Sequence, residues 1–250
     1  RSRGLGDVYK RQALMWLKRS LAKVEVCDSD KLGMKWHHGM LRFFAVNRDI
    51  FLRTLFLVMV NLFFTSFGSR QGTLMLSANT LLLTLFTLTS FFLDGLAYAA
   101  EALGGKYCGA ADRKAFSTLT RRLFLWGIIV AIVFTLVFAF GGNPLLHLLT
   151  SEHAVISTAL PYLPWAVAIP IAGVTAFLLD GLFIGLTATR PMLWSTALAA
   201  IVFFTLYFTL APTLHNHALW LALIAYLAMR GIVEMLMLRF SPSVFKSFMQ

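Results

Sequence analysis

Six long apolar blocks dominate the sequence and leave few folds open to it. Segments such as 126–138 show no alternation of polar and apolar side chains, which argues against a transmembrane β-barrel. A helix needs about 20 apolar residues to cross roughly 30 Å of hydrocarbon, and each block is long enough. We therefore expect an all-α membrane protein with six transmembrane helices. The blocks lie near 48–68, 74–103, 123–141, 158–187, 191–211 and 218–238.

The charged residues are few and unevenly placed. They make up 13% of the chain, whereas soluble domains carry about 25%. The formal net charge is +11, but a nucleic-acid-binding surface would concentrate this charge on an otherwise polar domain. Of the 22 Lys and Arg residues, 19 lie in one set of loops and the opposite loops contain only Arg70. Basic loops stay in the cytoplasm, so we expect a protein of the inner membrane with both ends of this chain cytoplasmic. The basic loops are 1–48, 104–122, 188–190 and 239–250.

The sequence offers no pattern typical of an enzyme. Cys27 and Cys108 both fall on the predicted cytoplasmic side, where thiols stay reduced, and neither has a metal ligand at suitable spacing. We find no nucleophile–base pair, metal-ligand cluster or Gly-rich phosphate loop. We therefore predict no enzymatic activity, no metal and no cofactor.

The segments outside the six blocks receive separate interpretations. Residues 1–12 have neither an initiator Met nor a signal-peptide core, and we interpret them as a non-native leader. Residues 13–47 are predicted to be a cytoplasmic linker that opens with the end of a truncated helix. Within this linker, 32–45 mixes basic and apolar residues as a membrane-surface segment does. We expect 48–238 to form the six-helix transmembrane lobe and 239–250 a cytoplasmic tail.

Two aspartates occur in matching apolar contexts. Phe-Phe-Leu-Asp-Gly-Leu at 91–96 recurs as Phe-Leu-Leu-Asp-Gly-Leu at 177–182. At 1.5 Å per residue, Asp94 and Asp180 each lie roughly 15–18 Å from the next cytoplasmic basic residue, well inside the hydrocarbon. An Asp at the centre of a membrane helix costs about 2.5–3.5 kcal/mol, so such acids face a bundle interior or a water-filled path. Asp94 and Asp180 are our candidates for cation coupling and transport.

Two arginines and two glutamates complete the set of charged residues near these acids. Arg53 and Arg230 fall inside predicted spans and are candidate partners of the aspartates. An Asp–Arg pair can also simply tie two helices together, and this alternative stays open. Glu101 and Glu234 lie nearer the cytoplasmic interface, and we favour a structural role for both.

Uncharged residues suggest where the helices bend and touch. Asn61 and Asn79 can line a polar path, although hydrogen bonding between helices is the alternative. Pro161, Pro164 and Pro170 predict a kinked fourth span. The small-xxx-small pair at 181 and 185, both Gly, predicts that another helix approaches closely there.

Several separated motifs follow one another along the chain. The motifs are Val-Asn-Arg-Asp-Ile-Phe-Leu-Arg-Thr-Leu at 46–55, Leu-Asp-Gly-Leu-Ala-Tyr-Ala-Ala-Glu-Ala-Leu-Gly-Gly at 93–105, Gly-Ala-Ala-Asp-Arg-Lys at 109–114, Tyr-Leu-Pro-Trp-Ala-Val-Ala-Ile-Pro at 162–170 and Leu-Asp-Gly-Leu-Phe-Ile-Gly at 179–185. Together and in this order they resemble the carboxy-terminal half of a DinF-type member of the multidrug and toxic compound extrusion (MATE) family, and the resemblance covers roughly residues 40–240.

The resemblance implies a fold and a function. Family members have two six-helix lobes, and this chain resembles the linker and helices seven to twelve. Implied is secondary active efflux of cationic or amphipathic compounds in exchange for H⁺ or Na⁺. Asp180 would lie on the tenth helix, where some members carry an acidic coupling residue, and Asp94 on the eighth. The implied partners are membrane lipids, H⁺ or Na⁺, a small-molecule substrate and the missing amino-terminal lobe, without nucleic acid.

Two alternatives remain open. A lipid-linked oligosaccharide flippase of the same superfamily would need several basic residues to meet a pyrophosphate, and only Arg53 and Arg230 are available inside the spans. We rank it below the efflux transporter. A non-transporting membrane interaction module is the third hypothesis. Because alternating access needs both lobes, we expect this chain alone not to complete a transport cycle.

Overall fold

The computed structural model describes residues 36–240, and every long element in that range is an α-helix. Within these residues, six helices are long and apolar enough to cross a membrane, which confirms the predicted all-α membrane fold. The predicted leader, the first part of the linker and most of the tail lie outside the described residues. The elements are α2 (Trp36–Ser69), α3 (Thr73–Gly109), α4 (Arg113–Leu149), α5 (His153–Ala159), a 3₁₀ turn (Leu160–Tyr162), α6 (Leu163–Gly185), α7 (Thr189–Leu214) and α8 (Asn216–Phe240).

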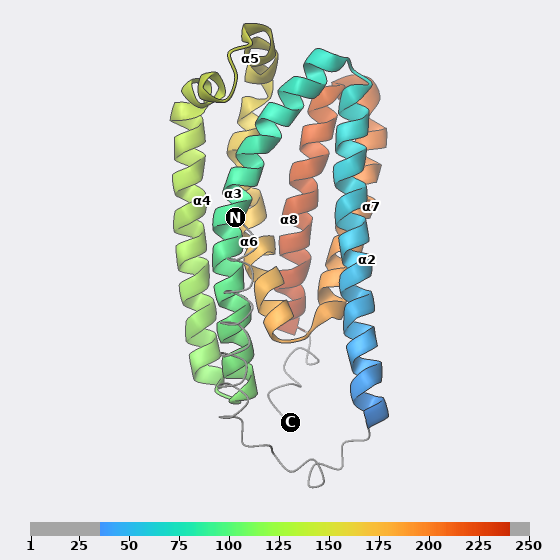
Figure 1. The fold of residues 1–250 in the computed structure, drawn as a ribbon, viewed down its shortest axis with the longest axis vertical. Coiled ribbons are helices and arrows are strands. Elements are labelled where there is room, and N and C mark those ends of the chain that lie inside the picture. The colour runs from blue at the N-terminus through green and yellow to red at the C-terminus, as the bar shows by residue number, and fades with distance from the viewer. Residues whose placement is uncertain (1–35, 241–250) are drawn as a thin grey trace, which may run out of the picture. The chain divides into compact units, whose positions relative to one another are not determined.

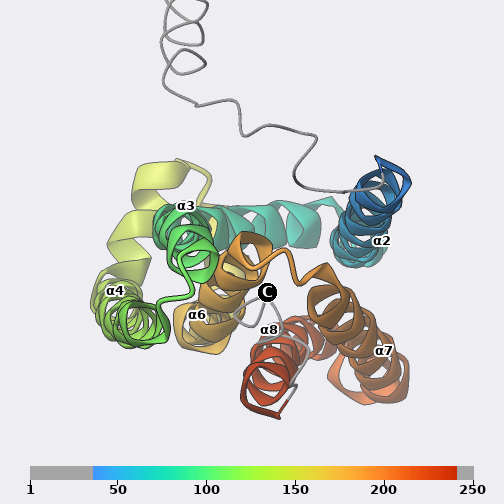
Figure 2. The ribbon, with the colours of Figure 1, turned by 90° about the horizontal axis from the view of Figure 1, so that it is seen from below.

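From residue 46 onward the long helices run alternately up and down (Figure 1). The turns at 110–112 and 186–188 lie at one end, which we call the basic end because Lys106, Arg113 and Arg190 flank them. Helix α6 lies between its neighbours and packs against α3, α4 and α8 (Figure 2). In the span that ends with α6, His153–Gly185, 61% of an apolar 18-residue window is buried, against 11% in the span Phe43–Ser69 of α2. Helix α6 therefore forms the centre of the packing and α2 its least buried member.

The helices extend beyond the apolar blocks that predicted them. Helix α4 begins at Arg113, ten residues before the predicted start, because the apolar block marks only the part that meets hydrocarbon. The carboxylate of Asp112 caps this helix by accepting a 2.9 Å hydrogen bond from the Ala115 N–H. Helix α2 likewise begins at Trp36, inside the predicted linker.

The fourth block is broken where its first prolines lie. Pro161 falls in the 3₁₀ turn and Pro164 at the start of α6, so the block divides into α5, the turn and α6. Pro170 lies inside α6 without ending it. The predicted bend thus lies near the first two prolines, where each missing N–H falls at a helix start.

Helices α3 and α6 approach each other at backbone distance. A Cβ atom added to Gly181 would overlap the carbonyl oxygen of Ala97, and one added to Gly185 would overlap that of Glu101. On the opposite helix, a Cβ on Gly105 would lie 3.1 Å from the carbonyl oxygen of Gly185. This confirms the predicted close approach at the two α6 glycines. It also fixes the depth of Asp180, the neighbour of Gly181, relative to α3.

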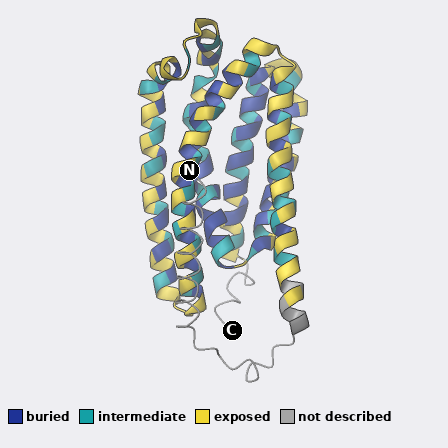
Figure 3. Cartoon of the chain, viewed as in Figure 1, coloured by how far each residue is buried: buried dark blue, intermediate teal, exposed yellow. Residues whose placement is uncertain are grey.

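Burial follows the same arrangement. Buried residues are concentrated on α6 and α8, and many residues of α4 are exposed (Figure 3). Large apolar residues such as Phe140 and Ile201 are exposed on the bundle, as expected for surfaces that meet lipid tails. Near the end opposite the basic one, Phe63 of α2 packs edge-on against Phe204 of α7, with 4.9 Å between ring centroids.

Candidate functional site

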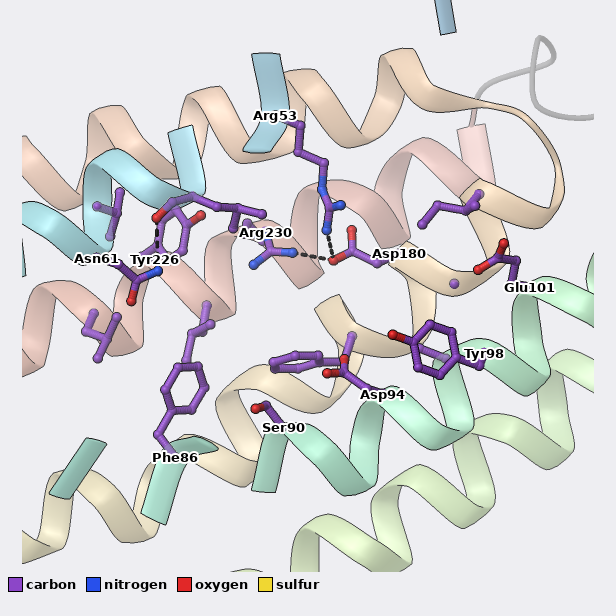
Figure 4. Close-up of a pocket in the computed structure, with 18 residues that line it drawn as sticks. Arg53, Asn61, Phe86, Ser90, Asp94, Tyr98, Glu101, Asp180, Tyr226 and Arg230 are labelled. Atoms are coloured by element: carbon purple, nitrogen blue, oxygen red, sulfur yellow. Dashed lines mark hydrogen bonds and ion pairs between the residues drawn. The ribbon is translucent and has the colours of Figure 1, made fainter. Parts of the chain in front are cut away.

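Asp180 lies at the meeting point of three helices. Its Oδ2 atom accepts hydrogen bonds from Arg53 Nη2 of α2 and from Arg230 Nη2 of α8 (Figure 4). Asp180 is 7% exposed and Arg230 4% exposed. The partnership expected from the sequence is therefore present, and it joins α2, α6 and α8 through a single carboxylate oxygen.

The charges of this cluster do not balance. Two guanidinium groups share one carboxylate, so the three side chains carry a formal charge of +1. The second oxygen of Asp180, Oδ1, is buried and has no hydrogen-bond partner among the described residues. The Arg230 guanidinium also lies over the ring of Tyr226, 5.6 Å from its centroid, a favourable position for a cation. An unbalanced buried cluster of this kind responds strongly to a change of charge on Asp180.

The cluster opens into a pocket of about 390 Å³ between α2, α3, α6 and α8. Its lining combines charged and aromatic side chains, and three acids face two arginines. Figure 4 shows the labelled side chains gathered around one space. The polar, charged and aromatic lining residues are Arg53, Asn61, Phe86, Ser90, Asp94, Tyr98, Glu101, Phe177, Asp180, Tyr226 and Arg230.

Helix α3 supplies two acids with an aromatic ring between them. Asp94, Tyr98 and Glu101 follow at spacings of four and three residues, which places them on one face of the helix. Neither carboxylate forms an ion pair with a described residue, and both are half-buried. The sequence interpretation gave Glu101 a structural role at the interface. In the structure Glu101 lines the pocket. Its spacing of seven residues from Asp94, which places both on one helix face, could have predicted this position from the sequence.

The two predicted asparagines have different surroundings. Asn61 lines the pocket, and its Nδ2 donates a 2.9 Å hydrogen bond to the carbonyl oxygen of Leu57 on its own helix. Asn79 is absent from the pocket lining. It exchanges two 2.9 Å hydrogen bonds with Asn216 of α8 and accepts a third from Trp220 Nε1. Because these partners satisfy the Asn79 side chain within the core, its position corresponds to the alternative of hydrogen bonding between helices.

Two further buried acids lie outside the pocket. Asp49 at the basic end of α2 is 2% exposed, accepts a 2.9 Å hydrogen bond from Arg48 and lies 3.3 Å from the hydroxyl of Thr189 on α7. Glu234 on α8 is fully buried, with its Oε1 atom 2.7 Å from Ser195 Oγ of α7. Within residues 36–240, no group of three or more His, Cys, Asp or Glu side chains is placed to hold a metal ion.

Comparison with known proteins gives the family. Residues 50–210 match the MatE family. Over 214 residues the chain is 40% identical to DNA damage-inducible protein F of Escherichia coli (strain K12), an alignment that covers 86% of this chain and 46% of that relative. The chain thus spans about half the length of the relative. From these matches and the six membrane helices, the chain belongs to the multidrug and toxic compound extrusion (MATE) family of transporters, in its DinF-type branch.

Proposed function

We propose that the chain is the carboxy-terminal six-helix lobe of a secondary active efflux transporter. In this proposal, the protein exports cationic or amphipathic compounds in exchange for H⁺ or Na⁺ by alternating access. The observation that carries the proposal is the buried carboxylate of Asp180, held by two arginines at the wall of an open pocket. Ionisable residues buried in membrane spans usually mark an ion or substrate path.

The geometry suggests how a bound cation changes the lobe. While Asp180 is ionised, it attracts Arg53 of α2 and Arg230 of α8 to the same point on α6. Binding of a proton to Asp180 leaves two guanidiniums close together without a counter-charge. Repulsion then favours a state in which α2 moves away, because α2 is the least buried of the spans. A cation thereby shifts the population between two arrangements of the pocket wall.

The pocket chemistry supports a cationic substrate. Asp94 and Glu101 form no ion pair with a described residue, and the exposed ring of Tyr98 lies between them on the same helix face. An organic cation with an apolar body can place its charge near a carboxylate and its rings against aromatic side chains. Both pocket arginines already contact Asp180. For this reason the flippase hypothesis, which needs free basic groups for a pyrophosphate, ranks below efflux.

The proposed partner is a second six-helix lobe, because this chain covers 46% of its relative and alternating access needs two halves that move against each other. Membrane lipids surround the outer faces. The proposed location is the inner membrane, with the basic end in the cytoplasm, as the distribution of Lys and Arg predicts. Asp180 and Asp94 are the proposed cation-coupling and transport residues, and Arg53 and Arg230 are the partners of Asp180.

A chimera tests the function. This chain replaces the segment of the Escherichia coli relative that it matches, and cells that lack other efflux pumps express the product. We expect the chimera to lower the accumulation of a fluorescent lipophilic cation, and Asp180→Asn to abolish this effect. Asp112→Asn is the matched control, because Asn also caps helices and Asp112 lies outside the pocket. Efflux at the wild-type rate by the Asp180→Asn chimera would exclude Asp180 as the coupling residue.

A further inference from the structure

Glu234 is a fully buried acid that does not line the pocket. It follows Arg230 by one turn of α8, yet it forms no ion pair with any described residue. The charged groups that act on it are Asp180 of α6, Arg230 of its own helix and Arg53 of α2. From α7 the group that touches it is the hydroxyl of Ser195. A buried carboxyl without a paired cation calls for an explanation.

The contacts of Ser195 indicate where a proton lies. Ser195 Oγ is 2.7 Å from Glu234 Oε1 and 2.9 Å from the backbone carbonyl oxygen of Met192. A serine hydroxyl has a single proton and can donate only one of these hydrogen bonds. The carbonyl oxygen of Met192 accepts and cannot donate. Both contacts are full two-centre hydrogen bonds when Ser195 donates to Met192 and the Glu234 carboxyl donates to Ser195 Oγ, and this arrangement requires a protonated Glu234; with an ionised Glu234, one serine proton would be divided between two acceptors.

Desolvation leads to the same protonation state. Glu234 Oε2 is buried and has no hydrogen-bond partner among the described residues. A carboxylate in this position would keep its charge with one oxygen unsolvated, whereas a neutral acid leaves only a carbonyl group unpaired. The neutral form is therefore the less costly one here.

We propose that Glu234 carries a proton in this conformation and is a second proton site of the lobe, separate from the pocket. Its O–H group joins α8 to α7 through Ser195. When α7 and α8 separate, water reaches the carboxyl, the O–H bond breaks and the proton passes to water. The carboxylate that remains has Arg230 one turn away as a counter-charge. A role of Glu234 in proton-coupled transport rests on the proposed function, whereas the protonation of Glu234 does not depend on it.

Infrared spectroscopy on the purified chain tests the protonation directly. At neutral pH we expect a C=O stretching band of a protonated carboxylic acid that shifts in D₂O. Glu234→Gln should lose this band, and Asp112→Asn, which changes an exposed acid, should keep it. The glutamine amide can still donate to Ser195 Oγ, so the variant is expected to fold. Identical carboxylic-acid bands in the wild type and Glu234→Gln would overturn the proposal.

Thermal unfolding gives a second measure of the same claim. Glutamine mimics a protonated glutamate, so Glu234→Gln should leave the Tm close to that of the wild type. If Glu234 were instead an ionised counter-charge for Arg230, the substitution would remove that charge and lower the Tm clearly. A large drop in Tm for Glu234→Gln therefore contradicts a protonated Glu234.

Efflux measurements separate this proposal from the proposed function. In an active chimera, Glu234→Gln cannot release a proton, so we expect the dependence of efflux on external pH to weaken relative to Asp112→Asn. An unchanged pH profile would overturn the coupling role of Glu234. If the wild-type chimera shows no efflux while the infrared band responds to Glu234→Gln, the proposed function fails and the proton site stands.

Discussion

Arg53 and Asp180 are 127 residues apart in the chain and form a direct ion pair inside the helix bundle. Arg230 contacts the same carboxylate oxygen, so two cations from two helices depend on one anion. The three residues therefore differ in what their removal leaves behind. Loss of either arginine leaves an ion pair behind, whereas loss of Asp180 leaves two guanidiniums without an anion.

Removal of Asp180 should destabilise the lobe more than removal of one arginine. We expect Asp180→Ala to lower the free energy of unfolding by about 3–5 kcal/mol, the usual cost of leaving a buried charge unpaired. Arg53→Met should cost less, because Arg230 still pairs with Asp180 and the Arg53 side chain is the more exposed of the two. In Asp180→Ala/Arg230→Met, the second change should restore part of the loss. Denaturant unfolding in detergent measures all three, and additive effects in the double variant would contradict a shared cluster.

Two glycines in matching sequence contexts should differ sharply in their tolerance of a side chain. A Cβ on Gly181 overlaps the backbone of Ala97, which no rotamer change can relieve, whereas a Cβ on Gly95 has no atom within 4 Å apart from its chain neighbours and the backbone of its own helix. We expect Gly181→Ala to separate α3 from α6 and to lower the Tm by several degrees. Gly95→Ala should be neutral or slightly stabilising, because Ala favours a helix by about 1 kcal/mol over Gly. Equal melting temperatures for the two variants would show that α3 and α6 do not approach at Gly181.

This pair of glycines also marks the limit of prediction from the sequence. The repeated Asp-Gly motif predicted that both aspartates lie deep in the membrane, and the small-xxx-small pair at 181 and 185 predicted the close contact on α6. The sequence could not show that α3 is the helix that approaches, because that depends on how α6 packs between α3 and α8. The apolar blocks likewise predicted six helices but not their ends, since helices continue into the polar layer.

The pairing of the arginines with Asp180 was easier to predict from the sequence than the surroundings of the two glutamates. Asp180, Arg53 and Arg230 were selected because ionisable residues are rare inside apolar spans, and the structure shows them in contact. Glu101 and Glu234 were assigned structural roles from their nearness to the basic end. The position of a residue along a predicted span does not show which side of the helix it lies on. It therefore could not show that Glu101 lines the pocket or that Glu234 contacts Ser195 of α7.

The two asparagines should differ in what their removal costs. Asn79→Ala leaves the amide of Asn216 and the indole N–H of Trp220 buried without partners. Each unsatisfied group costs about 1–3 kcal/mol, so we expect a clear loss of stability. Asn61→Ala is the control, because Asn61 is exposed and bonds only within α2. Thermal unfolding of the two variants compares them, and similar small losses would argue against a buried amide cluster at Asn79.

Binding of an organic cation should depend on the acids of α3. We expect Asp94→Asn to weaken binding of a fluorescent lipophilic cation to the purified chain about tenfold, since an ion contact in a partly desolvated pocket is worth about 1.4 kcal/mol or more. Tyr98→Leu should weaken it less, because an apolar contact remains when the aromatic face is lost. Asp112→Asn removes the same charge from an exposed position at the basic end and should leave the Kd unchanged. Equal Kd values for Asp94→Asn and Asp112→Asn would mean that the cation responds to the overall charge of the chain and not to the pocket.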